Sequence, residues 1–292
     1  MNYIEPVFRP PSEWKSYILQ VTNGCSWNQC TFCEMYTAPQ KKFHFKEISQ
    51  IADELKLVAS HPQRVSRVFL ADGDAMTLST RRLLQILKAV RTHLPNVNRV
   101  TSYCLPRNLK SKTVAELKTL RKNGLKMVYV GCESGDDEVL EHVKKGESYE
   151  TSLNALQKLK AAGIKSSVMI LNGLGGKKLS KQHAINSARL MNEAQPEYLS
   201  TLVVSFPMGE QRFRSNFTDY EALGQQGLFQ EMEWLLSELE LEKTIFRSDH
   251  ASNYLVLKGT LGQDKDKLLN QIKLAMQDPE LMPLRQEWQR GL

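Results

Sequence analysis

Three cysteines lie within nine residues of one another, and they are the side chains of this sequence best suited to hold a metal centre. Four residues separate Cys25 from Cys30, and two separate Cys30 from Cys33. A structural zinc takes four protein ligands, whereas a four-iron cluster held by three cysteines keeps one iron open for another ligand. The spacing therefore favours an iron-sulfur cluster. A zinc site completed by His44 or a distant cysteine, and three unrelated thiols, are the alternatives.

Further motifs follow the later strand-like runs of the sequence. They are Asp72-Gly73-Asp74, Gly131-Cys132-Glu133-Ser134-Gly135, Asn172-Gly173-Leu174-Gly175-Gly176 and Ser205-Phe206-Pro207. Taken alone, Asp-Gly-Asp is an ordinary turn, and the glycine-rich segment lacks the pattern of a phosphate-binding loop. In barrel-like α/β proteins, however, active groups gather at the C-terminal ends of the strands. The shared position of these motifs therefore indicates one site.

The aromatic Phe32, directly before the third cysteine, completes a Cys-x4-Cys-x2-Cys segment that resembles the cluster motif of the radical S-adenosylmethionine (radical SAM) superfamily. The usual spacing in that family is Cys-x3-Cys-x2-Cys. The resemblance implies a 4Fe-4S cluster on Cys25, Cys30 and Cys33, with SAM bound to the open iron. It also implies reductive cleavage of SAM to a 5′-deoxyadenosyl radical that abstracts hydrogen from a substrate, while the protein orients the reactants and excludes water.

The same resemblance implies which residues bind SAM. The segment from Asp72 to Ala75 would receive the SAM ammonium, either on Asp74 or on backbone oxygens alone, because glycine permits close approach and a carboxylate favours the positive charge. Glu133 would accept hydrogen bonds from SAM, and Lys145 would offer a point charge to its carboxylate. For Lys145, an exposed position at a helix end is the alternative. The complete set expected to bind SAM is Phe32, Tyr36, Asp72, Gly73, Asp74, Ala75, Ser102, Glu133, Lys145, Asn172, Gly173 and Ser205.

Apolar runs of strand length alternate with helical patterns, which predicts βα units and a parallel sheet. The predicted strands span 17–22, 67–71, 99–104, 127–132, 166–171 and 199–205, and the predicted helices 46–60, 80–93, 113–123, 151–162, 180–192, 220–241 and 264–277. With the resemblance, this order implies an α/β fold, an incomplete (β/α)6 TIM-like barrel with a C-terminal α-rich extension. We expect an N-terminal segment at 1–14, the barrel at 15–217 and the extension at 218–292.

Composition excludes several classes of protein. Hydrophobic residues make up 41% and charged residues 24%, as in ordinary globular proteins. The sequence has no secretory signal and no run long enough to span a membrane, which predicts a cytoplasmic protein with reduced thiols. Its net charge of +7 is spread over many positions, Lys41 among them, as on a solvated surface. Cys104 and Cys132 are too few to hold a second cluster.

Residues 247–254 combine a charge, a titratable ring, an amide and a phenol within eight positions, in Arg247, His250, Asn253 and Tyr254. This variety suggests a wall of a substrate pocket, with a loop that satisfies buried backbone groups as the alternative. The other five histidines, including His183, are expected at the surface or at helix ends.

The family resemblance implies a one-electron donor such as flavodoxin or ferredoxin. Without auxiliary-cluster cysteines or interleaved basic and aromatic residues, the sequence favours a small-molecule substrate over RNA. An RNA-modifying radical enzyme and a non-catalytic iron-sulfur or zinc protein are the alternative functions. The motifs leave the substrate and the reaction unnamed.

Overall fold

The structure is a computed structural model that describes residues 3–61 and 65–290. The predicted first and last segments also include residues 1, 2, 291 and 292, which lie outside this range. The strands are β1 (Tyr17–Gln20), β2 (Thr22–Asn23), β3 (His44–Phe45), β4 (Arg67–Ala71), β5 (Arg99–Cys104), β6 (Leu125–Glu133), β7 (Lys165–Asn172), β8 (Tyr198–Val203), β9 (Ile245–Ser248) and β10 (Leu257–Thr260). The helices are α1 (Ile48–Ala59), α2 (Thr80–His93), α3 (Val114–Lys122), α4 (Asp137–His142), α5 (Tyr149–Ala162), α6 (Gly176–Ala194), α7 (Gln211–Arg214), α8 (Gln225–Glu238) and α9 (Lys265–Gln277). Single 3-10 turns lie at Pro11–Glu13, Pro39–Lys41, Ala75–Thr77, Pro106–Leu109, Pro279–Leu281 and Glu287–Gln289.

The chain divides into two compact units. The first unit comprises the described residues up to Asn28, together with Cys33–Val130 and Gln157–Ser166. The second comprises Gln29–Phe32, Gly131–Leu156 and the described residues from Ser167 onward. The division expected from the sequence, at residues 15 and 218, stays a prediction.

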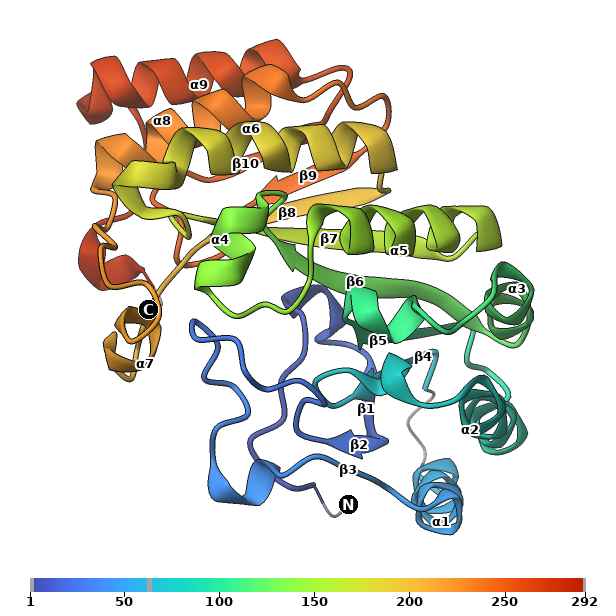
Figure 1. Cartoon of the computed structure of the whole chain (residues 1–292). Coiled ribbons are helices and arrows are strands. Elements are labelled where there is room, and N and C mark those ends of the chain that lie inside the picture. Colours follow the sequence, from blue (N-terminus) through green and yellow to red (C-terminus); the bar gives the residue numbers. More distant parts are fainter. Residues whose placement is uncertain (1–2, 62–64, 291–292) are drawn as a thin grey trace. The chain divides into compact units, whose positions relative to one another are not determined.

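Eight of the strands belong to one mostly parallel sheet, and Figure 1 shows helices alternating with them along the chain. In the first unit β1 pairs with β4, β4 with β5 and β5 with β6, all in parallel. In the second unit β7 pairs with β8 and β8 with β9 in parallel, and β10 runs antiparallel to β9. The α/β prediction is therefore confirmed, with all six predicted strands present.

Hydrophobic spacing explains why these elements form. Strand β4 buries four consecutive side chains from Val68 to Ala71, as a parallel strand covered on both faces does. Helix α2 begins after Ser79, whose hydroxyl accepts the backbone N–H of Arg82 at 3.3 Å. Its buried residues, Leu83, Ile86, Leu87 and Val90, lie three or four positions apart and form one face. Strand β4 thus lies in the core and ends directly before Asp72.

The C-terminal part differs from the expected pair of helices. Both helices are present, as α8 and α9, but strands β9 and β10 lie between them, where no strand was expected. In β9 only Phe246 and Ser248 are buried and Arg247 is exposed, so the strand carries little hydrophobic signal of its own. Its pairing with β8 defines it as a strand.

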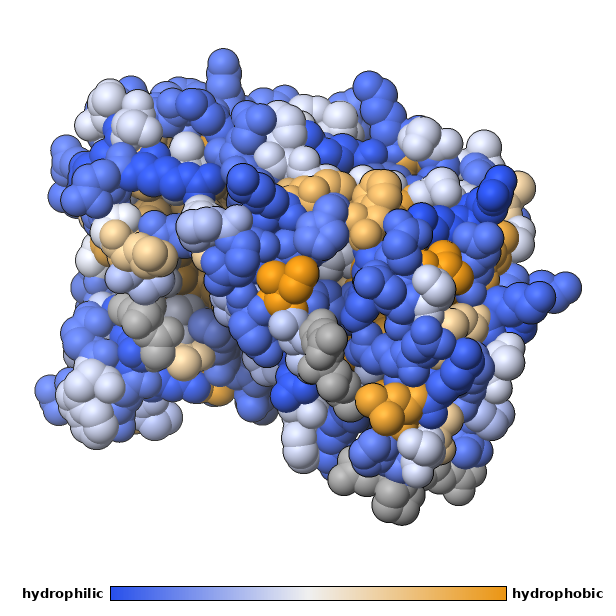
Figure 2. Space-filling model, turned by 90° about the horizontal axis from the view of Figure 1, so that it is seen from below, coloured by the Kyte–Doolittle hydropathy of each residue, from blue (hydrophilic) through white to orange (hydrophobic). Residues whose placement is uncertain are grey.

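Among the described residues, no helix is long and apolar enough to cross a membrane. The face drawn in Figure 2 is mostly hydrophilic, with hydrophobic side chains in small separate groups. Scattered apolar side chains of this kind are normal on protein surfaces.

Candidate active site

The first unit shapes both flanks of the cysteine loop, residues 24–43. Strands β2 and β3 pair antiparallel at its two ends, with Asn23 opposite His44. The Asn23 side-chain amide donates hydrogen bonds to the carbonyls of Gln40 and Lys42 at 2.7 and 2.9 Å. Gly24 has a φ of +70°, and a Cβ there would lie 2.1 Å from the Lys41 carbonyl oxygen. Only glycine therefore fits at the start of the loop.

The three cysteines of the loop differ in their exposure to solvent. Cys25 and Cys33 belong to the first unit and are partly exposed, whereas Cys30 belongs to the second and is buried. Across residues 3–61 and 65–290, no three cysteine, histidine or carboxylate side chains converge on a common metal position. Three soft thiolates from one short loop are the donor set that suits an iron-sulfur cluster.

The Asp72 to Ala75 segment packs directly against the start of the cysteine loop. A Cβ on Gly73 would lie 2.9 Å from the Cα of Cys25 and from the carbonyl oxygen of Gly24. Asp74 accepts the backbone N–H of Ser26 at 2.9 Å, the Ser26 hydroxyl, and the Asn108 amide at 3.1 Å. Burial raises the pKa of Asp74, and these hydrogen bonds oppose the rise. Asp74 therefore anchors the loop, and both of its oxygens are engaged by protein.

Asp72 forms a fully buried ion pair with Lys41. The expectation that Lys41 is a surface charge is wrong, because its side chain is 0% exposed and its ammonium also donates to the Ile4 carbonyl at 2.8 Å. The other Asp72 oxygen, Oδ1, is buried and has no hydrogen-bond partner among the described residues. A buried acceptor of this kind costs free energy unless a donor reaches it, so Asp72 Oδ1 fits an ammonium group of a ligand.

Two other residues expected at the site lie nearby in the first unit. Tyr36 is buried, and desolvation together with the Asp72 charge raises the pKa of its phenol. Ser102 is also buried, and its hydroxyl donates to the carbonyls of Leu70 and Tyr103, at 3.2 and 2.9 Å. Tyr36 thus lies close to Asp72, whereas the Ser102 hydroxyl is hydrogen-bonded to backbone carbonyls of the sheet.

In the second unit, Glu133 and Lys145 form a buried ion pair with Nζ 3.1 Å from Oε1. Lys145 is therefore not the exposed helix-end residue that the sequence left as an alternative. Glu133 ends β6 with a φ of +65°, and a Cβ on Gly131 would lie 2.2 Å from its carboxylate. Glycine at 131 thus gives that carboxylate its place beside Lys145. Non-glycine residues in the left-handed region occur often at functional sites.

Lys145 also lies beside the part of the cysteine loop that belongs to the second unit. Its ammonium is 5.8 Å from the centre of the Phe32 ring, and the Thr31 backbone N–H donates to the Val143 carbonyl at 3.0 Å. Burial lowers the pKa of Lys145, but the charges of Glu133 and Cys30 more than compensate, so its pKa is raised. Lys145 therefore stays protonated and can bind an anionic group.

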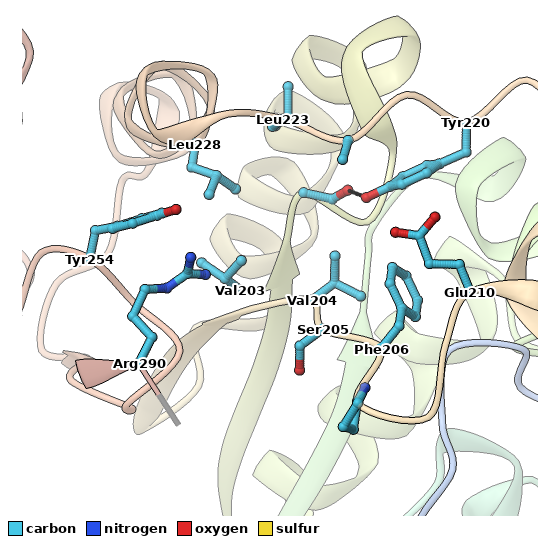
Figure 3. Close-up of a pocket in the computed structure, with 13 residues that line it drawn as sticks. Val203, Val204, Ser205, Phe206, Glu210, Tyr220, Leu223, Leu228, Tyr254 and Arg290 are labelled. Atoms are coloured by element: carbon cyan, nitrogen blue, oxygen red, sulfur yellow. Dashed lines mark hydrogen bonds between the residues drawn. The ribbon is translucent and has the colours of Figure 1, made fainter. Parts of the chain in front are cut away.

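Asn172, Gly173 and Ser205 follow β7 and β8 in the second unit. Asn172 is buried at the end of β7, and its carbonyl accepts the Val204 N–H at 2.9 Å. Gly173 and Ser205 line a cavity of about 350 Å³ together with Tyr254. Figure 3 shows this cavity and the hydrogen bond from the Tyr220 hydroxyl to the Gly173 carbonyl, which measures 2.9 Å.

A buried polar network lies next to Glu133 and includes His183. The expectation that His183 lies at the surface is therefore wrong. His183 is 1% exposed, and its Nε2–H donates to the Leu171 carbonyl at 3.0 Å, which leaves Nδ1 to accept the Ser134 hydroxyl at 2.8 Å. Glu231 on α8 lies 4.0 Å from His183 and accepts the Gly173 N–H at 2.6 Å. Burial raises the pKa of Glu231. No local pattern could have shown that α6 and α8 bury these groups together.

The four residues expected to bind substrate are not gathered in one place. Arg247 is exposed on β9, and Asn253 is buried and donates to the Thr201 carbonyl at 3.0 Å. His250 shares a 2.9 Å hydrogen bond with the Ser252 hydroxyl, and burial lowers its pKa. Of the four, Tyr254 alone lines the cavity in Figure 3. A substrate role for the whole segment stays a prediction.

The fold is an α/β fold with a mostly parallel sheet, and its cysteine loop carries three thiols of the kind that hold an iron-sulfur cluster. Residues 19–191 match the model of the radical SAM superfamily. The chain therefore belongs to the radical SAM superfamily and is an enzyme. Members of the superfamily use a 4Fe-4S cluster and SAM, as the resemblance implied.

Individual relatives are distant. The chain is 23% identical over 147 residues to an uncharacterized methyltransferase from Pyrococcus horikoshii, covering 50% of this chain and 30% of that one. It is 24% identical over 155 residues to a putative methylthiotransferase from Methanocaldococcus jannaschii, covering 50% and 33%. It thus spans about a third of the length of these curated relatives.

Among solved structures, the chain is similar to coproporphyrinogen III oxidase from Escherichia coli, a radical SAM enzyme. The TM-score is 0.56 at 16% identity, with 76% of this chain and 52% of that chain covered. This similarity concerns the fold, and it confirms the predicted fold class.

Proposed function

We propose that this enzyme cleaves SAM reductively and uses the resulting radical to take a hydrogen atom from a small molecule. The observation that carries the proposal is that two predicted SAM segments contact the cysteine loop. In the first unit Gly73 lies against Cys25. In the second, Val143 accepts the Thr31 N–H at 3.0 Å and the Lys145 ammonium lies 5.8 Å from the centre of the Phe32 ring. A protein that only carried electrons would not need such segments beside its cluster.

The bound cluster and SAM would supply the reactivity, a one-electron cleavage that yields a 5′-deoxyadenosyl radical. Cys25, Cys30 and Cys33 would hold the cluster. Asp72 Oδ1, buried without a donor, would accept a hydrogen bond from the SAM ammonium, and protonated Lys145 would bind its carboxylate. Asp74, which the sequence put forward for the ammonium, would act by anchoring the loop at Ser26 instead.

The test is anaerobic reconstitution with iron and sulfide, followed by reduction in the presence of SAM and measurement of 5′-deoxyadenosine. Ala at Cys25, Cys30 or Cys33 should remove the bound iron, the visible absorbance and the product. The matched control is Cys104→Ala, which removes a buried thiol of the first unit outside the loop and should keep the iron, the absorbance and the product. A full cluster in the triple variant would contradict the proposal.

RNA modification is the second candidate, because one relative carries the name of a putative methylthiotransferase. Retention on tRNA that falls steeply with salt would favour RNA, since counterion release makes such binding salt-dependent. We favour a small molecule because a cavity of about 350 Å³ lies in the second unit. Cavities of this size are typical of small-ligand sites.

A further inference from the structure

The cavity at the ends of β7 and β8 carries two charged side chains for which the site described above gives no role. Its walls between them are apolar and include Val203, Leu223 and Leu228. Arg290 lies at one end and Glu210 at the other, as Figure 3 shows. All of these residues belong to the second unit.

Arg290 is fixed in position by its surroundings. Its Nε donates to the Ser252 carbonyl at 2.9 Å, and its Nη1 donates to Glu287 at 2.7 Å. The guanidinium carbon lies 3.8 Å from the centre of the Tyr254 ring, and the side chain is only 6% exposed. Among the described residues Nη2 has no hydrogen-bond partner. Arg290 thus presents a preorganised donor to the cavity.

Glu210 is held on one side only. Its Oε2 accepts the Arg214 Nε–H at 2.5 Å. Within the described part of the chain, Oε1 accepts no hydrogen bond. In Figure 3 its carboxylate lies near Phe206 and Tyr220, separated from the Arg290 end by Val203 and Val204. The cavity therefore has a cationic end, an apolar middle and an anionic end.

We propose that this cavity binds a small zwitterion whose carboxylate meets Arg290 and whose ammonium meets Glu210, with an apolar chain between them. A guanidinium and a carboxylate each form strong charge-assisted hydrogen bonds with such groups. A ligand with one charge would engage only one of the two available atoms, either Nη2 of Arg290 or Oε1 of Glu210. The inference rests on the proposed function, because the apolar chain of such a substrate would supply the carbon that loses hydrogen.

The test uses three compounds of equal chain length: 6-aminohexanoate, hexanoate and hexylammonium. Their affinities are measured by calorimetry on the cluster-loaded enzyme with saturating SAM. The zwitterion should bind about tenfold or more tightly than either singly charged compound, because each charge-assisted hydrogen bond contributes that much. Arg290→Gln should weaken 6-aminohexanoate and hexanoate and leave hexylammonium unchanged. Glu210→Gln should weaken 6-aminohexanoate and hexylammonium and leave hexanoate unchanged.

Matched controls exist in the same unit. Arg189 also lies over a tyrosine ring, at 4.9 Å from Tyr149, and pairs with Glu193, but it does not line the cavity. Arg189→Gln and Glu221→Gln should leave all three affinities unchanged. If Arg290→Gln does not fold, Arg290→Lys keeps the charge without the planar fork and should retain part of the preference for hexanoate over hexylammonium.

Three results would overturn the proposal. The first is equal affinity for the three compounds, and the second is a loss of all of them alike in both variants. The third is binding of 6-aminohexanoate that is seen without SAM and lost when SAM is added, which would assign the cavity to the cofactor. Production of 5′-deoxyadenosine is measured separately. Its absence would refute the proposed function even if the zwitterion binds, whereas its presence without zwitterion binding would refute only this inference.

Discussion

The buried pair Glu133–Lys145 offers the most decisive test of the site, since stability and cofactor binding can be measured on the same four proteins. These are the unchanged enzyme, Glu133→Gln, Lys145→Met and the double variant. The two side chains are 11% and 3% exposed and lie 3.1 Å apart. Removing one partner of a buried pair leaves an uncompensated charge, which costs about 3–5 kcal/mol. Denaturant unfolding should show this cost in each single variant.

The double variant should cost less than the sum of the two single variants, because neither charge is then left alone. The control is the exposed pair Lys177–Glu221, whose atoms lie 3.0 Å apart with both side chains more than 60% exposed. Lys177→Met should change the stability little. Additive costs in the Glu133–Lys145 cycle would refute the reasoning about coupling.

Cofactor binding is then measured on the folded, cluster-loaded proteins. If Lys145 also binds the SAM carboxylate, Lys145→Met loses a charge-assisted hydrogen bond of about 1.5–3 kcal/mol. Because about 1.4 kcal/mol corresponds to tenfold in affinity, the Kd for SAM should rise about tenfold or more. An unchanged Kd, with full iron content, would show that the pair is structural only.

Two further predictions concern the loop and the buried network. Gly73→Ala should lower the iron bound per protein while the fold persists, because its Cβ would lie 2.9 Å from the Cα of Cys25; Gly224→Ala, where no atom lies within 4 Å, should keep the iron. The raised pKa of Glu231 means that this carboxyl stays protonated in the folded state at pH values above 4.5, where it ionises in the unfolded chain. The free energy of unfolding should therefore fall as the pH rises from 4.5 toward the raised pKa of the folded state. Glu231→Gln should remove this fall and exposed Glu221→Gln should not, as urea unfolding at several pH values would reveal.

The sequence by itself determined the order of the six predicted strands and the helices between them, and it indicated the chemistry of the cysteine loop. The six predicted strands are present because each is a short apolar run bounded by turn residues, a pattern that is local. The helix at Val114–Lys122 begins with a capping box, a signal that is also local. The Thr113 N–H donates to the Glu116 carboxylate at 2.8 Å, and the Glu116 N–H donates to the Thr113 hydroxyl at 3.2 Å. The cysteine spacing and Phe32 were enough to indicate the family.

Only the tertiary structure decided which polar residues are buried and which side chains they contact. The sequence predicted Lys41 at the surface, but the fold buries it beside Asp72. It also predicted His183 at the surface, but the fold buries it beside Ser134 and Glu231. Burial of a charge is decided by partners far away in the chain, because the cost of desolvation is met only by a partner that the fold brings close. The same holds for β9, a strand defined by its pairing with β8.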